Sequence, residues 1–218
     1  MGHERSLTAR GAGANRVFGF TLIEMAIMLT IFGVLLLGGV EAIRAQTAKR
    51  KMEQGQAAVQ EIQRALLGFV TAYGRLPYAA NPASGTGVEE AARTFGLLPW
   101  NSLGVKPVDP WGHAYTYHVT GGYAVEGTFM TTSGSLVVRN AGDTADMVTD
   151  LPVVVVSHGP NGKGAYLTNG SQLSTTAATP MDTENLDGDV NYRLGGDDIL
   201  LWISEDVLKY QKGTYVPP

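Results

Sequence analysis

Apolar side chains dominate the chain from Phe20 to Val40, where the only side chains with polar groups are those of Thr21, Glu24 and Thr30. A helix rises about 1.5 Å per residue, so this segment would extend about 31 Å, close to the thickness of the hydrocarbon core of a bilayer. The pattern therefore predicts a transmembrane helix over residues 20–40. An acidic side chain inside such a helix is costly, so Glu24 is expected to have a partner or a function.

Beyond residue 40 the apolar positions follow one side of a helix. They recur at spacings of three, four or seven, as in an amphipathic helix, at Ala48, Met52, Val59, Ile62, Leu66, Phe69, Val70 and Tyr73. The first proline after Phe20 is Pro77, and it predicts the end of the helix just before it. We therefore expect one helix over residues 20–73, about 80 Å long.

The sequence of residues 74–218 predicts a globular head. Short runs of β-branched and aromatic residues lie between glycine-rich turns, which favours antiparallel strands at Ala114–Val119, Tyr123–Glu126, Leu136–Arg139, Val153–Ser157 and Ile199–Ser204. A short helix is expected over residues 88–95. The predicted fold class is α+β, with a long N-terminal transmembrane and amphipathic helix packed on a small antiparallel β-sheet.

The net charge and the cysteine content limit which functions and which stabilising bonds we expect for this chain. The formal net charge is −4, which argues against a general attraction to nucleic acid. Residues 1–19 carry Arg5, Arg10 and Arg16 against Glu4, a net charge of +2, so the remainder of the chain carries −6. The chain contains no cysteine, and no disulfide can therefore hold the head together.

The run Gly19-Phe20-Thr21-Leu22-Ile23-Glu24-Met25 at the start of the apolar segment resembles the processing motif of type IV prepilins and pseudopilins. In that family a prepilin peptidase cuts after a glycine and methylates the new N-terminus, and the fifth residue of the mature subunit is glutamate. The resemblance implies a leader over residues 1–19, a methylated N-terminus at Phe20 and an assembly role for Glu24. The alternative is an uncleaved signal-anchor; an ordinary secretory signal would have its cleavage site after the apolar region.

Three blocks of the head are similar to major pseudopilins of type II secretion: Asp109-Pro110-Trp111-Gly112, Ser157-His158-Gly159-Pro160 and Asp197-Asp198-Ile199. This resemblance implies a pilin-like structural subunit of a type IV pilus-like filament and no enzyme activity. The alternative is a minor type IV pilin that acts in adhesion or DNA uptake. The implied partners are the prepilin peptidase, other pilin or pseudopilin subunits, an inner-membrane assembly platform and membrane lipid. The implied location is the bacterial inner membrane with a single pass and the head in the periplasm.

The resemblance also implies a possible cofactor, because the corresponding loop of those pseudopilins binds calcium in place of a disulfide. The candidate ligands here are carboxylates, the hard oxygen donors that calcium prefers, at Asp187, Asp189, Asp197 and Asp198. The alternative interpretation is a solvated acidic loop.

Other candidate groups give weaker signals. Lys49-Arg50-Lys51 could bind DNA, but three successive residues of a helix point in different directions, which favours a solvated basic surface. The four histidines, His3, His113, His118 and His158, lack the spacing of metal ligands. Ser157 and His158 are neighbours on a predicted strand and face opposite ways, so they are not expected to form a catalytic pair.

Overall fold

The computed structural model describes residues 19–173, 185 and 188–213. The chain divides into two units, residues 1–47 and residues 48–218. Helix α1 (Leu22–Tyr73) runs through 52 residues and contributes to both units. It ends at Gly74, whose φ of 67° lies in the left-handed region and whose N–H donates to the carbonyl oxygen of Val70 at 2.8 Å. A glycine in this conformation is a common helix C-terminus.

The predicted transmembrane segment is wrong. Within the described part of the chain, no helix is both long and apolar enough to cross a membrane. The expectation had included Glu24 in the spanning segment, although a charged side chain is costly inside a bilayer.

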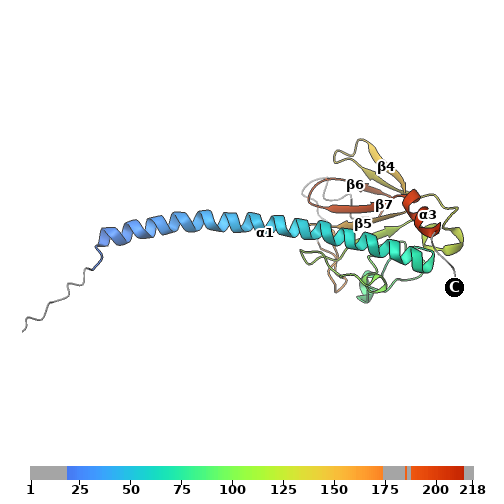
Figure 1. Ribbon diagram of the computed structural model, residues 1–218, viewed down its shortest axis with the longest axis horizontal. Helices are drawn as coiled ribbons and strands as arrows, with labels where there is room; N and C mark the ends of the chain where they lie inside the picture. Colours follow the sequence, from blue (N-terminus) through green and yellow to red (C-terminus); the bar gives the residue numbers. More distant parts are fainter. Residues whose placement is uncertain (1–18, 174–184, 186–187, 214–218) are drawn as a thin grey trace, which may run out of the picture. The chain divides into compact units, whose positions relative to one another are not determined.

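The head is built on a four-stranded antiparallel sheet in the order β1-β2-β5-β7, of which Figure 1 labels β5 and β7. Its strands are β1 (Phe95–Leu97), β2 (Thr116–Val119), β5 (Val153–Ser157) and β7 (Ile199–Ile203). The α1 residues after position 47 lie against one face of it. Their buried side chains recur every three or four positions, as helix geometry requires for one face, at Val59, Ile62, Leu66 and Val70. They pack in one core with sheet residues such as Tyr117 and Val155.

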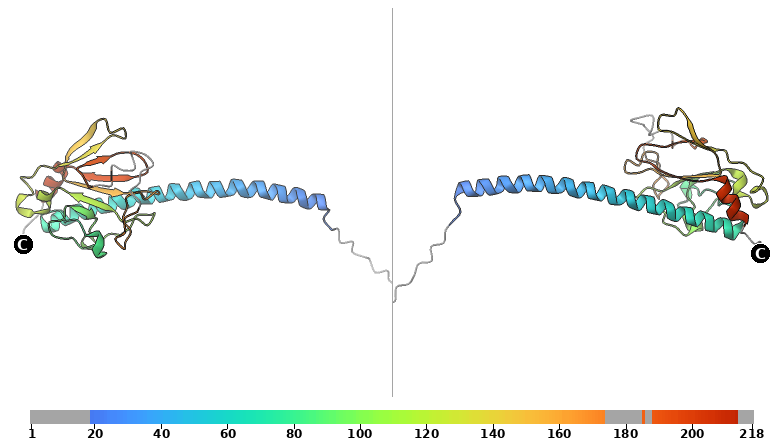
Figure 2. Two further views of the ribbon diagram at one scale, coloured as in Figure 1. Left: turned by 180° about the vertical axis from the view of Figure 1, so that it is seen from behind. Right: turned by 45° about the horizontal axis from the view of Figure 1, so that its top comes forward.

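A second sheet covers the other face of β5 (Figure 2). It has the order β4-β3-β6 and consists of β4 (Asp146–Leu151), β3 (Leu136–Arg139) and β6 (Asn191–Arg193). The β3–β4 pair is antiparallel and the β3–β6 pair is parallel. The expectation of a single small antiparallel sheet is therefore wrong. An alternating strand pattern gives the two faces of a strand but not its partner strands, so the sequence did not place β3 in a separate sheet.

The remaining elements are short. They are η1 (Pro82–Ser84), α2 (Trp100–Leu103), η2 (Gly121–Ala124), η3 (Glu126–Thr128) and α3 (Glu205–Gly213). Residues 123–126, predicted to be a strand, instead end η2 and begin η3, in a segment that is punctuated by three glycines. The helix predicted over residues 88–95 is also absent: this segment contains a turn at residues 91–92 and then enters β1.

An ion pair fixes the chain where it leaves α1. The guanidinium of Arg75 donates to both carboxylate oxygens of Glu89, at 2.8 Å each, and the N–H of Tyr78 donates to the same carboxylate at 2.9 Å. Both side chains of the ion pair are about three-quarters buried. Bidentate, partly buried pairs of this kind are among the stronger polar contacts in proteins.

We expect Glu89→Gln to lower the free energy of unfolding by about 1–3 kcal/mol, because the substitution removes a charged acceptor from a partly buried guanidinium. Denaturant unfolding of the full chain measures this change. Glu90→Gln is the matched control, since Glu90 pairs with Arg93 in a more exposed position and should contribute about 0–1 kcal/mol. Equal effects of the two substitutions would contradict the prediction.

Candidate functional site

The predicted processing motif includes the last residues before α1 and its first turn. Thr21 precedes the helix, and its hydroxyl accepts a hydrogen bond from the N–H of Glu24 at 3.3 Å. In return, Oε2 of Glu24 accepts from the N–H and from the hydroxyl of Thr21, at 2.9 Å each. This reciprocal arrangement is a capping box, which satisfies N–H groups that the first turn of a helix leaves unpaired.

The capping box leaves part of the Glu24 carboxylate free. Both hydrogen bonds go to Oε2, and among the described residues Oε1 has no hydrogen-bond partner. The backbone hydrogen bond from Thr21, followed by the one from its hydroxyl, lowers the pKa of Glu24 below its ordinary value. The side chain is therefore held as an ionised acceptor with one oxygen available to a second partner.

The neighbouring residues of α1 expose apolar side chains. Phe20 is 73% exposed and Leu22 is 90% exposed, and the same property is shared by Ile23, Met25, Ile27, Met28, Leu29, Ile31, Phe32, Val34, Leu35 and Ile43. Gly19 is the residue before the predicted cut, and apart from its chain neighbours no atom of the described part of the chain lies within 4 Å of the position that its Cβ would take. Such a continuous set of exposed apolar side chains marks a surface that other molecules cover.

The predicted calcium ligands have other partners where the structure describes them. Asp189 accepts from the backbone N–H of Asn191 at 2.7 Å, and Asp198 accepts from the side-chain amide of Asn185 at 2.8 Å. Asp187 lies outside the described residues. In the part of the chain that is described, no three acidic or histidine side chains are grouped so that they could hold a metal ion. Calcium binding stays a prediction.

Asp197 instead joins two loops of the head directly. Its Oδ2 accepts from the backbone N–H of Asn161 at 2.9 Å, and its Oδ1 accepts from the side-chain amide of the same residue at 2.6 Å. Gly159 lies so close to this contact that an added Cβ would be 2.2 Å from the carbonyl oxygen of Asp197. These hydrogen bonds connect the segment after β5 to the start of β7.

The polar residues of the Asp109-Pro110-Trp111-Gly112 block have a structural role. Oδ1 of Asp109 accepts from the N–H groups of Trp111 and His113, and Oδ2 accepts from the hydroxyl of Ser157 at 2.7 Å. The hydroxyl of Ser157 is thus donated to a buried carboxylate. His158 is fully buried, and its Nε2 contacts the hydroxyl of Thr116 at 2.8 Å.

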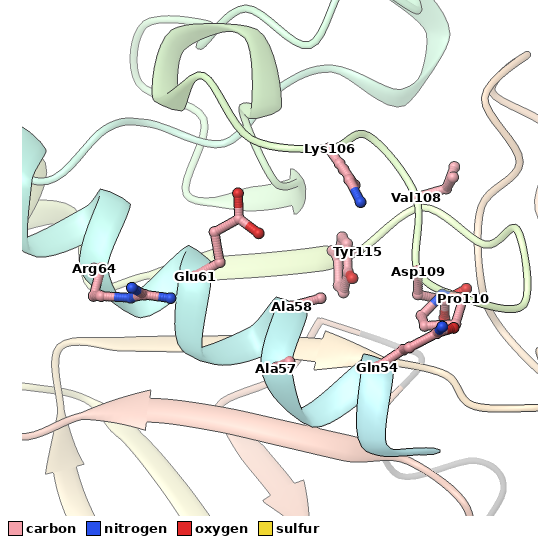
Figure 3. Close-up of a pocket in the computed structure, with 10 residues that line it drawn as sticks. All are labelled: Gln54, Ala57, Ala58, Glu61, Arg64, Lys106, Val108, Asp109, Pro110 and Tyr115. Carbon is pink, nitrogen blue, oxygen red and sulfur yellow. The ribbon is translucent and has the colours of Figure 1, made fainter. Parts of the chain in front are cut away.

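A groove of about 530 Å³ runs between α1 and the segment that follows α2 (Figure 3). Its helix wall contains Gln54, Ala57, Ala58, Glu61 and Arg64, and the facing wall contains Lys106, Val108, Asp109, Pro110 and Tyr115. The hydroxyl of Tyr115 is buried and has no hydrogen-bond partner among the described residues. Burial, followed by the charges of Asp109 and Glu61, raises the pKa of Tyr115, so it stays protonated.

Two features of these sites, the capping box and the groove, were not predicted from the sequence. The capping box was readable as Thr-x-x-Glu at residues 21–24, directly before an apolar run. The groove had no sequence signal, because its walls come from segments more than forty residues apart. Comparison with known protein families, with curated proteins and with solved structures finds no match.

Proposed function

We propose that the chain is a prepilin-like structural subunit that is cut after Gly19 and assembles into a type IV pilus-like filament, most specifically the pseudopilus of a type II secretion system. The observation that carries the proposal is Glu24, an ionised side chain with one free carboxylate oxygen, placed at the start of a helix whose apolar side chains are exposed.

The exposed apolar residues of α1 supply the driving force for assembly. Fully burying a side chain such as Leu29 or Phe32 contributes roughly 1.5–3 kcal/mol, so side-by-side packing of a few such helices outweighs the entropy lost on association. Apolar contacts do not fix the position of one helix along another, because they are not directional. A charge contact does, and the free oxygen of Glu24 is suited to the N-terminal ammonium that cleavage would create at Phe20 of a neighbouring copy.

The head supports a structural role in the same filament. The residues that resemble pseudopilins are bonded to one another, as Asp109 is to Ser157 and Asp197 is to Asn161. A head held in this way presents a constant surface at each position of the filament. The periplasmic location of the head and the calcium site stay predictions.

Cleavage at the N-terminus gives the direct test of the proposed function. In cells with an active prepilin peptidase, the protein should begin at Phe20 with a methylated amine, and Gly19→Arg should accumulate with residues 1–19 attached. Mass spectrometry of the N-terminal peptide distinguishes the two forms.

The structure makes the Gly19→Arg variant informative. Apart from its chain neighbours, no atom of the described residues lies within 4 Å of a Cβ at this position, so we expect the substitution to act on recognition by the peptidase and not on packing. Cells that lack the peptidase provide the second control. Normal cleavage of Gly19→Arg, or an intact leader on the wild-type protein in the presence of the enzyme, would overturn the proposal.

A further inference from the structure

The segment between β5 and β6 contains two asparagines that are each followed by glycine, in the pairs Asn161-Gly162 and Asn169-Gly170. Such a pair is chemically labile, because glycine has no Cβ to hinder the approach of its backbone nitrogen to the asparagine Cγ. The attack requires an asparagine amide that is free to turn and a glycine backbone that is free to move. The structure gives the two pairs different restraints.

Asn161 is held by three hydrogen bonds. Its Nδ2 donates to Oδ1 of Asp197 at 2.6 Å, its backbone N–H donates to Oδ2 of Asp197 at 2.9 Å, and its Oδ1 accepts from the N–H of Lys163 at 2.8 Å. The glycine beside it is buried, and an added Cβ on Gly162 would lie 2.4 Å from Cε1 of His113. Both the amide and the following backbone are therefore fixed.

Asn169 lies in a surface turn. The N–H of Leu167 donates to the carbonyl oxygen of Ser171 at 2.8 Å, and Oδ1 of Asn169 accepts from the N–H of Ser171 at 2.9 Å. Asn169 and Ser171 are exposed, and Gly170 is half-buried. Among the described residues the Nδ2 of Asn169 has no hydrogen-bond partner. Asn169 thus forms the same local Asx turn as Asn161, without the contact that holds the amide nitrogen of Asn161.

The turn also favours attack on the side chain of Asn169. The N–H of Ser171 donates to Oδ1 and so draws electron density away from Cγ, while the unbonded amide nitrogen is free to leave. One restraint remains, because the N–H of Gly170 donates to the carbonyl oxygen of Leu167 at 2.9 Å. Hydrogen bonds in exposed turns open locally at low free-energy cost, so this contact delays the reaction without preventing it.

We propose that Asn169 is a site of spontaneous deamidation in the folded protein. The backbone nitrogen of Gly170 gives its proton to water or hydroxide and forms a bond with Cγ of Asn169. The bond from Cγ to the amide nitrogen breaks, and that nitrogen takes up a proton and leaves as ammonia. Water then opens the resulting five-membered imide at either carbonyl, which yields aspartate or isoaspartate. The head gains one negative charge at this turn, whether or not the chain assembles.

Peptide mapping tests the proposal on the full chain. The protein would be kept at mildly alkaline pH, with and without denaturant, and sampled over time. Trypsin cleaves after Lys163 and Arg193, so the two pairs lie on separate peptides, and tandem mass spectrometry locates each conversion of amide to carboxylate. In denaturant both pairs should react at comparable rates. In the folded chain we expect Asn169 to react several-fold faster than Asn161, which serves as the internal control.

Two variants test the assignment. Asn169→Gln keeps an amide but lengthens the side chain, so the five-membered ring cannot form, and the peptide that contains it should lose its main conversion. Asp197→Ala releases the amide of Asn161 and should raise the rate there several-fold while leaving the rate at Asn169 unchanged. The comparison of folded and denatured wild-type chain needs no variant, so it decides the proposal even if Asp197→Ala fails to fold.

The outcomes bear on Asn169 separately from the proposed function. Equal rates at the two asparagines of the folded chain, or no reaction at Asn169 over a time in which the denatured chain reacts, would overturn the proposal. An unchanged rate at Asn161 in folded Asp197→Ala would contradict the restraint that we assign to the bound amide. None of these results affects cleavage after Gly19 or the yield of filament, which are measured independently.

Discussion

Replacing Glu24 with alanine should remove most of the assembled filament while leaving the unfolding of the head unchanged. The described contacts of the Glu24 carboxylate are confined to Thr21, in the same turn, so the head loses no hydrogen bond. Assembly loses the free carboxylate oxygen that we assign to the N-terminal ammonium of a neighbouring subunit. The effect is repeated at every subunit that is added, so a modest loss for each contact becomes a large loss of filament.

The capping box requires a further set of variants, because Glu24→Ala removes a helix cap as well as a charge. Glu24→Gln keeps the cap, since glutamine also accepts from the N–H of Thr21, but it removes the charge. Thr21→Ala weakens the cap and keeps the charge. We expect Glu24→Gln to assemble as poorly as Glu24→Ala, Thr21→Ala to assemble much better than either, and Glu24→Asp to be intermediate because its carboxylate has a shorter reach.

The measurement is the amount of sheared or cross-linked filament at equal levels of processed subunit, with N-terminal mass spectrometry to establish that all variants are cleaved. If Glu24→Gln assembled like the wild type while Thr21→Ala failed, Glu24 would be a helix cap and not an assembly contact. Equal amounts of filament from all the variants would contradict both the capping role and the assembly role of Glu24.

The strand-forming segments of the head could largely be located from the sequence, whereas their arrangement could not. Three of the five predicted segments coincide with β3, β5 and β7, and β2 covers the end of a fourth. The alternation of apolar and polar residues and the enrichment in β-branched residues are local features, so they can be recognised in a single sequence. The parallel pairing of β3 with β6 joins segments more than fifty residues apart and depends on how the whole chain packs.

The sequence of β5 nonetheless indicated that both faces of this strand are covered. The run Val153-Val154-Val155-Val156 has no polar residue on either face, and all four side chains are buried. Uninterrupted apolar strands are typical of sheets covered on both faces, here by α1 on one side and by the sheet of β3, β4 and β6 on the other. The expectation of a helix on a single sheet overlooked this signal.

The candidate sites show the same difference between features that are local in the sequence and features that depend on the fold. Gly19, Phe20 and Glu24 lie within six residues of one another, so their motif and their local geometry are both fixed by sequence. The acidic residues Asp189, Asp197 and Asp198 are close in sequence, but their side chains bond to different amides. Short sequence spacing places ligands together only when the backbone turns them toward a common point, and that turn is not determined by composition.

Lowering the pH should destabilise the head through two buried histidines. His118, on β2, is 8% exposed, and its Nδ1 contacts the hydroxyl of Tyr192 at 2.8 Å; His158 is fully buried. Burial lowers the pKa of His118 to about 4, against a weaker opposing effect of Asp189. Burial, followed by the charge of His113, lowers the pKa of His158 to about 4, against a weaker opposing effect of the Lys163 backbone.

The sign of the effect follows from proton binding in the two states. An unfolded histidine has a pKa near 6.5, so between pH 6.5 and 4 the unfolded chain binds more protons than the folded one. Stability is therefore complete above pH 6.5 and is lost as the pH falls toward 4. Each histidine contributes a slope of up to about 1.4 kcal/mol per pH unit, or about 3 kcal/mol over the whole interval.

Denaturant unfolding of the full chain at a series of pH values between 8 and 4.5 measures this slope. His118→Gln should flatten the slope by about one proton below pH 6.5, and the further change His158→Gln should flatten it by about one more. Tyr192→Phe is the matched control, because it removes the partner of His118 but keeps the titrating ring, so it should lower stability while preserving the slope. A wild-type curve that is level from pH 8 to 5, or a slope unchanged in the double histidine variant, would show that these histidines titrate in the folded head as they do in the unfolded chain.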